Sequence, residues 1–218
     1  MLDVLFPQRC VVCRRTGGQL CADCRVALRR IPPPLCERCG APTAWPVRRC
    51  GECAGRRLAF ASARAALVYD DAARALIRGW KEQGLRRLAA VAADLAVETI
   101  ARPDVAALVS VPPDDDRRLL RGHHPATALA QELGKRWALP LETSIARRGP
   151  RSRQAGLSLA ARRGNVRGAF VPVGPTASTV CLVDDVYTSG ETANAAASAL
   201  RKAGARRVDV VSLARAVR

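Results

Sequence analysis

The sequence predicts an α/β protein in which a parallel sheet, covered by helices on both faces, follows a small cysteine-rich module. First, eight of the nine cysteines fall within the first 53 residues, as four C-x-x-C pairs. Second, beyond residue 57, apolar strand-like runs alternate with stretches of helical periodicity, the order typical of parallel sheets. Third, the most apolar run, VCLVDD at 180–185, ends in two acidic residues before a short polar loop. We therefore expect a cysteine-rich module at 1–57 and an α/β domain at 58–218.

The four C-x-x-C pairs predict a double zinc ribbon. Two residues between thiolates let both sulfurs reach one tetrahedral zinc ion. A redox motif or buried thiols would explain one such pair, but four in tandem favour two structural zinc ions, whose binding supplies folding energy to a segment poor in apolar residues. Sequential pairing is favoured and a cross-braced pairing is the alternative. The predicted ligands are Cys10, Cys13, Cys21 and Cys24 for one ion, and Cys36, Cys39, Cys50 and Cys53 for the other.

The α/β domain is expected to begin with a strand and to end with one. Apolar positions at helical spacing predict the helices, and short apolar runs bounded by Pro or Gly predict the strands. Gly204 is a typical helix stop, and Cys181 is expected to be a small buried residue. In chain order, the expected elements are a strand at 60–69, helices at 70–80 and 85–101, a strand at 105–111, a helix at 125–139, strands at 166–173 and 180–185, a helix at 192–203 and a strand at 208–216.

The strand at 180–185 and the loop that follows predict a site for a ribose phosphate. Ligands of open α/β sheets lie at the carboxyl ends of the strands, where Asp184 and Asp185 are expected. The next helix directs free amides and its positive dipole end toward the same place, which suits a phosphate. Hydroxyls in the loop add donors, and Gly190 allows close backbone approach. The carboxylates can accept sugar hydroxyls, directly or through magnesium. The alternative is an Asp-rich turn that only caps a helix.

Charge and composition favour phosphate-bearing partners. The formal charge is +17, almost all from arginine, with a pI near 10.9. Nucleotides, nucleic acid and anionic membranes are all compatible partners. Aromatic residues make up only 4%, which argues against an RNA-recognition-type stacking platform. No apolar run reaches the roughly 18 to 20 residues of a membrane span, and the N-terminus shows no secretory signal, so we expect the protein in the cytoplasm.

The stretch LVDDVYTSGET resembles the phosphoribosyl pyrophosphate signature of type I phosphoribosyltransferases. Together with the cysteine ribbon, and with the blocks SVPPDDDRRLLRG and RQAGLSLAARRGNVRGAF, it makes nearly the whole chain similar to the ComF/GntX family. The resemblance implies a phosphoribosyltransferase-like domain that binds phosphoribosyl pyrophosphate with magnesium, and Asp184 and Asp185 as the catalytic pair. It also implies ligand contacts from Tyr187, Thr188, Ser189, Gly190, Glu191, Thr192, Lys81, Arg117, Arg118 and Arg121.

The sequence departs from the family where RGHHP replaces Arg-Gly-Phe-Asn-Gln. His123 and His124 either replace the lost amides or are ordinary residues at the start of a helix, which we favour.

Two functions follow from the resemblance. The competence branch implies work on single-stranded DNA during uptake, beside a helicase-like motor. Trp45 and Trp80 could then stack on bases, although single tryptophans are more often core residues. The alternative is a metabolic phosphoribosyltransferase with a nucleobase or other small acceptor and no DNA role. The sequence does not identify that acceptor.

Overall fold

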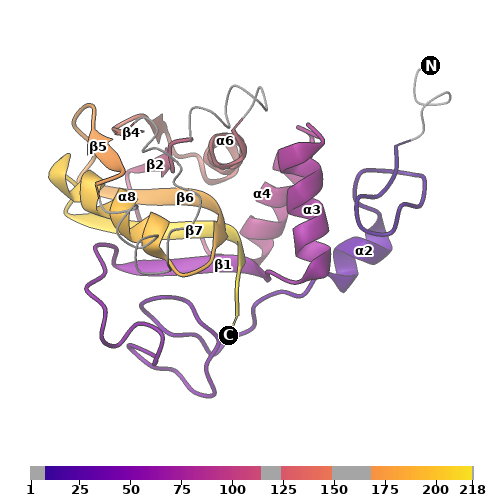
Figure 1. Ribbon diagram of the computed structural model, residues 1–218, viewed down its shortest axis with the longest axis horizontal. Helices are drawn as coiled ribbons and strands as arrows, with labels where there is room; N and C mark the ends of the chain where they lie inside the picture. The colour runs from indigo at the N-terminus through magenta and orange to yellow at the C-terminus, as the bar shows by residue number, and fades with distance from the viewer. Residues whose placement is uncertain (1–7, 114–123, 149–167, 218) are drawn as a thin grey trace, which may run out of the picture.

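The computed structural model describes residues 8–113, 124–148 and 168–217 (Figure 1). The predicted elements are present, with ends that differ by a few residues. Helix α2, strand β3 and strand β4 were not predicted, because each is too short to show a clear hydrophobic period. In chain order the elements are α2 (Ala22–Ala27), β1 (Ser62–Val68), α3 (Asp71–Glu82), α4 (Leu88–Thr99), β2 (Ala107–Ser110), α6 (Pro125–Trp137), β3 (Leu141–Glu142), β4 (Ile145–Arg147), β5 (Phe170–Pro172), β6 (Thr179–Tyr187), α8 (Glu191–Lys202) and β7 (Arg207–Arg215).

The main sheet has five parallel strands in the order β1-β7-β6-β2-β3, which confirms the predicted fold class. The strand expected at 166–173 needs correction. Only β5 forms there among the described residues, and it pairs antiparallel with β4 in a separate two-stranded sheet. A strand inside a parallel sheet is buried on both faces, whereas Val173, just after β5, is 57% exposed. This segment therefore lies outside the main sheet.

Helices cover both faces of the main sheet (Figure 1). Apolar residues of α3, α4 and α6 form one core with one face of the sheet, including Trp80, which is fully buried. Small residues of α8 pack on the other face together with Phe60 and Tyr187. The burial of Trp80 rules it out as a base-stacking residue, whereas Trp45 is 69% exposed. No helix in the described part of the chain is long and apolar enough to cross a membrane.

The cysteine-rich module packs on the α/β domain at two places. Its first half places Val11 and Leu28 in the core formed with α3 and α4. A Cβ at Gly79 in α3 would lie 2.7 Å from Val11, so the glycine makes room for this contact. The second half, from Cys36 to Cys53, joins the core on the α8 side. The module is therefore attached to both cores, and its second half lies beside the end of β6.

Candidate functional site

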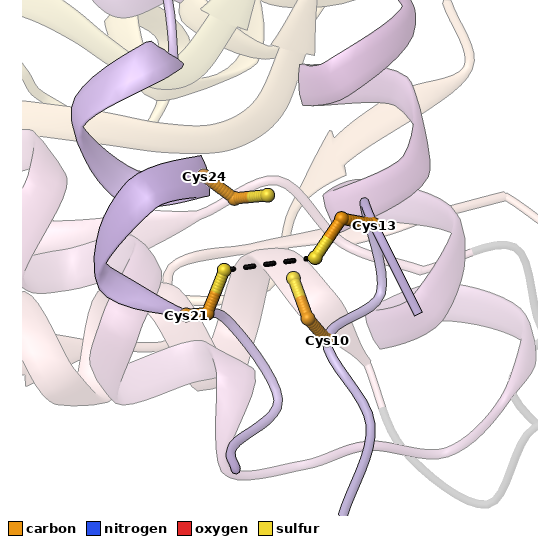
Figure 2. Close-up of side chains that lie close together, drawn as sticks. All are labelled: Cys10, Cys13, Cys21 and Cys24. Carbon is orange, nitrogen blue, oxygen red and sulfur yellow. Dashed lines mark hydrogen bonds between the residues drawn. The ribbon is translucent and has the colours of Figure 1, made fainter. Parts of the chain in front are cut away.

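Each group of four cysteine sulfurs converges on one point. Within a group, all sulfurs lie within 4.8 Å of one another. Zinc–sulfur bonds of about 2.3 Å in a tetrahedron place sulfurs about 3.8 Å apart, close to the observed spacing. In the first group the side chains point inward from both sides, with Cys21 and Cys24 at the start of α2 (Figure 2). The sulfur separations are 3.7 Å for Cys13–Cys21, 3.6 Å for Cys36–Cys53 and 3.5 Å for Cys39–Cys50.

These distances confirm sequential pairing, and the cross-braced alternative is wrong. One thiol in each cluster is also prepared for metal. Burial raises the pKa of Cys10, but hydrogen bonds from neighbouring backbone amides outweigh it and lower the pKa to about 6. The same balance lowers the pKa of Cys36 to about 7, and one of its donors is the Cys50 amide at 3.3 Å. A lowered pKa favours the thiolate, which is the metal-binding form.

We expect purified protein to contain two zinc ions per chain. Cys36→Ser should release one ion and leave the other, because the two clusters share no ligand and pack against different cores. Cys181→Ser is the matched control, since Cys181 is buried in β6 and belongs to neither cluster. Metal analysis by mass spectrometry measures the stoichiometry. Loss of both ions in Cys36→Ser, or one ion in the wild type, would contradict two independent sites.

The acid pair lies near the carboxyl end of β6, beside a lysine from α3. Lys81 Nζ is 2.5 Å from Asp185 Oδ2, so the structure brings together two residues predicted for one site. Asp184 Oδ1 accepts a hydrogen bond from the Asp185 amide at 2.8 Å. Burial and the charge of Asp185 raise the pKa of Asp184 to about 7, although Lys81 opposes the shift. The pair therefore has one carboxylate held by a cation and one that titrates near neutrality.

A short loop connects β6 to α8 directly after the acid pair. Gly190 caps the helix with a left-handed φ of 75°, and the first-turn amides have no partner within the helix. Ser189 Oγ lies 3.4 Å from the Glu191 amide, and Thr188 is exposed. This geometry, an open helix N-terminus following two carboxylates, is the one expected for a phosphate beside sugar hydroxyls.

The ring of Tyr187, a predicted ligand contact, lies in the core and not on the surface of the loop. The ring packs edge-on against Phe60 with centroids 6.3 Å apart, and the guanidinium of Arg215 lies 4.6 Å from its centroid. Only the backbone of Tyr187 could face a ligand. A Cβ at Gly190 would lie 2.2 Å from the Tyr187 hydroxyl oxygen. Gly190 is therefore needed for packing and for its φ, so Gly190→Val would distort the loop itself.

The cysteine-rich module holds this loop, which the sequence did not indicate. Arg56 donates to the Ser189 carbonyl at 2.6 Å and to the Glu191 carboxylate at 2.8 Å. The side chain of Glu191, predicted as a ligand contact, is therefore engaged by Arg56. Asn194 Oδ1 accepts from the Ala59 amide at 2.7 Å, which ties α8 to the same segment.

Arg215 forms the second connection to the module. Its guanidinium is buried and donates to the Cys39 carbonyl and to Glu52, both at 2.6 Å. One Nη also lies 3.9 Å from Cys39 Sγ, a member of the second cysteine cluster. Arg215 thus contacts the second cluster on one side and Tyr187 on the other. No local motif could have indicated Arg56 or Arg215, because their partners are distant in the sequence.

Three predicted ligand residues, Arg117, Arg118 and Arg121, lie outside the described residues. The same holds for His123 and for residues 153–167 of the family-like block at 153–170. The start of the block SVPPDDDRRLLRG runs beside the acid pair, since the Val111 amide donates to the Val183 carbonyl at 2.9 Å. His124 is the N-cap of α6, and its Nδ1 lies 3.3 Å from the Thr127 amide. The interpretation of His124 as a residue at the start of a helix is confirmed.

The chain is similar to several known proteins along nearly its full length. Residues 1–54 match the double zinc ribbon domain family. Competence protein F of Haemophilus influenzae is 30% identical, covering 97% of this chain and 98% of that protein. Competence protein ComFC of Streptococcus pneumoniae is 26% identical, covering 99% of this chain and 96% of that protein. The DNA utilization protein YhgH of Salmonella typhimurium is 29% identical, covering 96% of this chain and 97% of that protein.

Two solved structures are also similar to parts of the chain. The orotate phosphoribosyltransferase of Aeropyrum pernix is 21% identical, with a TM-score of 0.37 over 68% of this chain and 67% of that one. A purine phosphoribosyltransferase of Pyrococcus horikoshii is 17% identical, with a TM-score of 0.29 over 62% of this chain and 84% of that one.

Proposed function

Because the chain belongs to the ComF family of competence proteins, we propose that it binds phosphoribosyl pyrophosphate and assists the uptake of single-stranded DNA. We assign the ligand to a phosphoribosyltransferase-like domain at 58–218 and two structural zinc ions to the ribbon module at 1–57. The proposal places the protein in the cytoplasm, beside a helicase-like motor of the uptake machinery. The names of its relatives, two competence proteins and a DNA utilization protein, support the DNA part.

The observation that carries the phosphoribosyl part is the acid pair with Lys81, directly before the open end of α8. In this proposal the amides of the first turn and the hydroxyls of Thr188, Ser189 and Thr192 bind the 5′-phosphate. Asp184 and Asp185 accept the ribose hydroxyls. Their carboxylate oxygens are also the ligands that magnesium prefers, and the ion would neutralise the pyrophosphate. Lys81 is near enough to move from Asp185 to an incoming phosphate.

Transfer of the ribose to a small acceptor is the second candidate function. The half-buried acid pair favours it, because carboxylates at the reacting sugar can stabilise the positive charge that develops as pyrophosphate leaves. The protein would contribute mainly positioning and electrostatic stabilisation.

Calorimetric titration of phosphoribosyl pyrophosphate, with and without magnesium, tests the binding proposal. A pyrophosphate-release assay with a nucleobase panel and an electrophoretic shift with single-stranded DNA should run beside it. We expect binding of both ligands. DNA binding without the sugar phosphate would leave only the DNA role, and base-dependent pyrophosphate release without DNA binding would favour the metabolic transferase.

The affinity for phosphoribosyl pyrophosphate should rise with pH between 6 and 8. Asp184 must be ionised to accept hydroxyl protons, and its pKa is raised to about 7. Below that pH the carboxyl is protonated in the free protein, so binding must first expel a proton. From pH 8 to pH 6 the affinity should fall about tenfold. Asp184→Asn, titrated in parallel, should lose the part of the pH dependence that comes from ionisation of Asp184. It should keep the part that comes from the ligand's own phosphates. Equal pH profiles for the two proteins would contradict the assignment.

A further inference from the structure

Two adjoining hollows lie at the end of the main sheet opposite to the segment that joins β6 to α8, residues 187–192, which we call the phosphate loop. Their volumes are about 400 Å³ and 460 Å³, and both are lined by Arg38 and Ala61. Ala61 directly precedes β1, Arg207 begins β7 and Arg201 is in the last turn of α8, so this is where the parallel strands start. The phosphate loop lies where β6 ends. We call the combined surface the arginine groove; its arginines are Arg38, Arg48, Arg49, Arg201, Arg206 and Arg207.

Three of the six guanidiniums are held in place by backbone carbonyls, which do not neutralise their charge. Arg38 donates to the Leu58 carbonyl at 2.6 Å, Arg49 to two backbone carbonyls, and Arg201 to the Arg206 carbonyl. A carbonyl partner restricts a guanidinium but leaves its full charge available.

Among the residues that the structure describes, Arg207 is the only arginine of the groove with a carboxylate partner, Asp209 at 2.9 Å. Within the described ranges, Arg48 and Arg206 have no side-chain partner. Six arginines against Glu37 and Asp209 leave a formal charge of 6 − 2 = +4 on the groove.

The form of the groove indicates a polymer with repeated phosphates. Its cations are spread along two joined hollows, whereas a single phosphate needs donors that converge on one point. The lining also includes the small residues Ala59, Ala61 and Ser198, which leave space for a sugar-phosphate chain.

An exposed aromatic residue lies in the same segment of the ribbon. Trp45 is 69% exposed and lies three residues before Arg48, on the stretch between the two knuckles of the second cysteine cluster. Unstacked bases of a single strand can stack on such a side chain, whereas the bases of a duplex are already stacked. A bilayer surface would not fit into a concave groove in this way.

We propose that the arginine groove binds the phosphate backbone of single-stranded nucleic acid, at a site separate from the phosphoribosyl site. The proposal rests on the DNA part of the proposed function and gives it a location. Ten residues of α8 separate the phosphate loop from Arg201, a span of about 15 Å. The two ligands would therefore bind at the same time, without competing for one surface.

The test is fluorescence anisotropy with labelled (dT)20 at several salt concentrations. The groove variant is the double substitution Arg48→Ala with Arg206→Ala. The control is Arg15→Ala with Arg29→Ala, which removes the same charge from two exposed arginines of the first ribbon half. Losing two phosphate contacts should make the slope of log affinity against log salt shallower by about 1.4 and weaken binding at low salt about tenfold. The control should keep the wild-type slope.

Titration of phosphoribosyl pyrophosphate separates the two proposals. Both double variants should bind it as the wild type does. If the wild type binds DNA through the groove but does not bind the sugar phosphate, the phosphoribosyl part of the proposed function fails and the groove proposal stands.

Three results would overturn the proposal that the arginine groove binds nucleic acid. These are a wild type that binds no (dT)20, a groove variant whose slope of log affinity against log salt is unchanged, and a control that loses as much affinity as the groove variant. Binding to anionic phosphatidylserine vesicles that is lost in the groove variant, with (dT)20 binding intact, would assign the surface to a membrane instead.

Discussion

Replacing the acid pair by Asp184→Asn and Asp185→Asn should remove most of the affinity for phosphoribosyl pyrophosphate. An amide cannot replace a carboxylate that accepts two hydroxyl protons or holds magnesium. Hydrogen bonds to a charged acceptor contribute about 1.5 to 3 kcal/mol, so each single change should weaken binding about ten- to hundredfold. The two effects will not simply add, since the residues are neighbours that share a hydrogen bond. Calorimetric titration in the presence of magnesium measures the loss.

The two single variants should differ in one informative way. Asp185→Asn also frees Lys81, now 2.5 Å from that carboxylate, and the freed ammonium can bind a ligand phosphate. We therefore expect the smaller loss in Asp185→Asn.

Asp71→Asn provides a matched control for the acid pair, because Asp71 is an exposed residue whose ion pair is with Arg74 on the same helix, α3. The fold should survive all of these changes, which circular dichroism can verify. A folded double variant with wild-type affinity would show that the acid pair is only part of a turn.

Features that depend on residues close in sequence could be predicted. The spacing of the cysteines indicates zinc knuckles because two residues set the distance between two sulfurs. The pairing of the knuckles could not be decided in this way, since sequential and cross-braced arrangements use the same spacing. It became clear only from the sulfur positions, such as Cys36 and Cys53 at 3.6 Å.

Side-chain roles within the phosphate loop were less predictable. The motif suggested that every residue from 187 to 192 faces the ligand. The structure instead uses Tyr187 for the core and Glu191 for an ion pair with Arg56. Both outcomes depend on how the ribbon packs beside α8, and no hydrophobic period encodes that contact. Lys81 was found only through the family resemblance, because nothing local to α3 indicates a partner in β6.

The largest stability effect of a single substitution is expected at Arg215. Its side chain is 2% exposed and connects the second cysteine cluster to the core beneath the phosphate loop. Arg215→Met would remove the hydrogen bonds to the Cys39 carbonyl and to Glu52, and the stacking on Tyr187. Removing one partner of a buried ion pair costs about 3 to 5 kcal/mol, and we expect the lower end because the Glu52 side chain is 32% exposed and can still reach water.

Urea denaturation and zinc release together test the role of Arg215. The free energy of unfolding should fall by about 3 kcal/mol in Arg215→Met, and a chelator should remove zinc faster from the second cluster than from the first.

Arg207→Met is the matched control for Arg215→Met. Arg207 lies at the other end of β7, and its side chain is 56% exposed although it also pairs with an aspartate. The partner Asp209 is buried, with its side chain 8% exposed, but it keeps a hydrogen bond from the Ser62 hydroxyl at 2.8 Å. Arg207→Met should therefore lose less stability than Arg215→Met. Phosphoribosyl pyrophosphate affinity should fall in Arg215→Met alone, because Tyr187 lies directly beneath Gly190 and loses its guanidinium partner. Equal stability and equal affinity in the two variants would mean that the contacts of Arg215 do not support the loop.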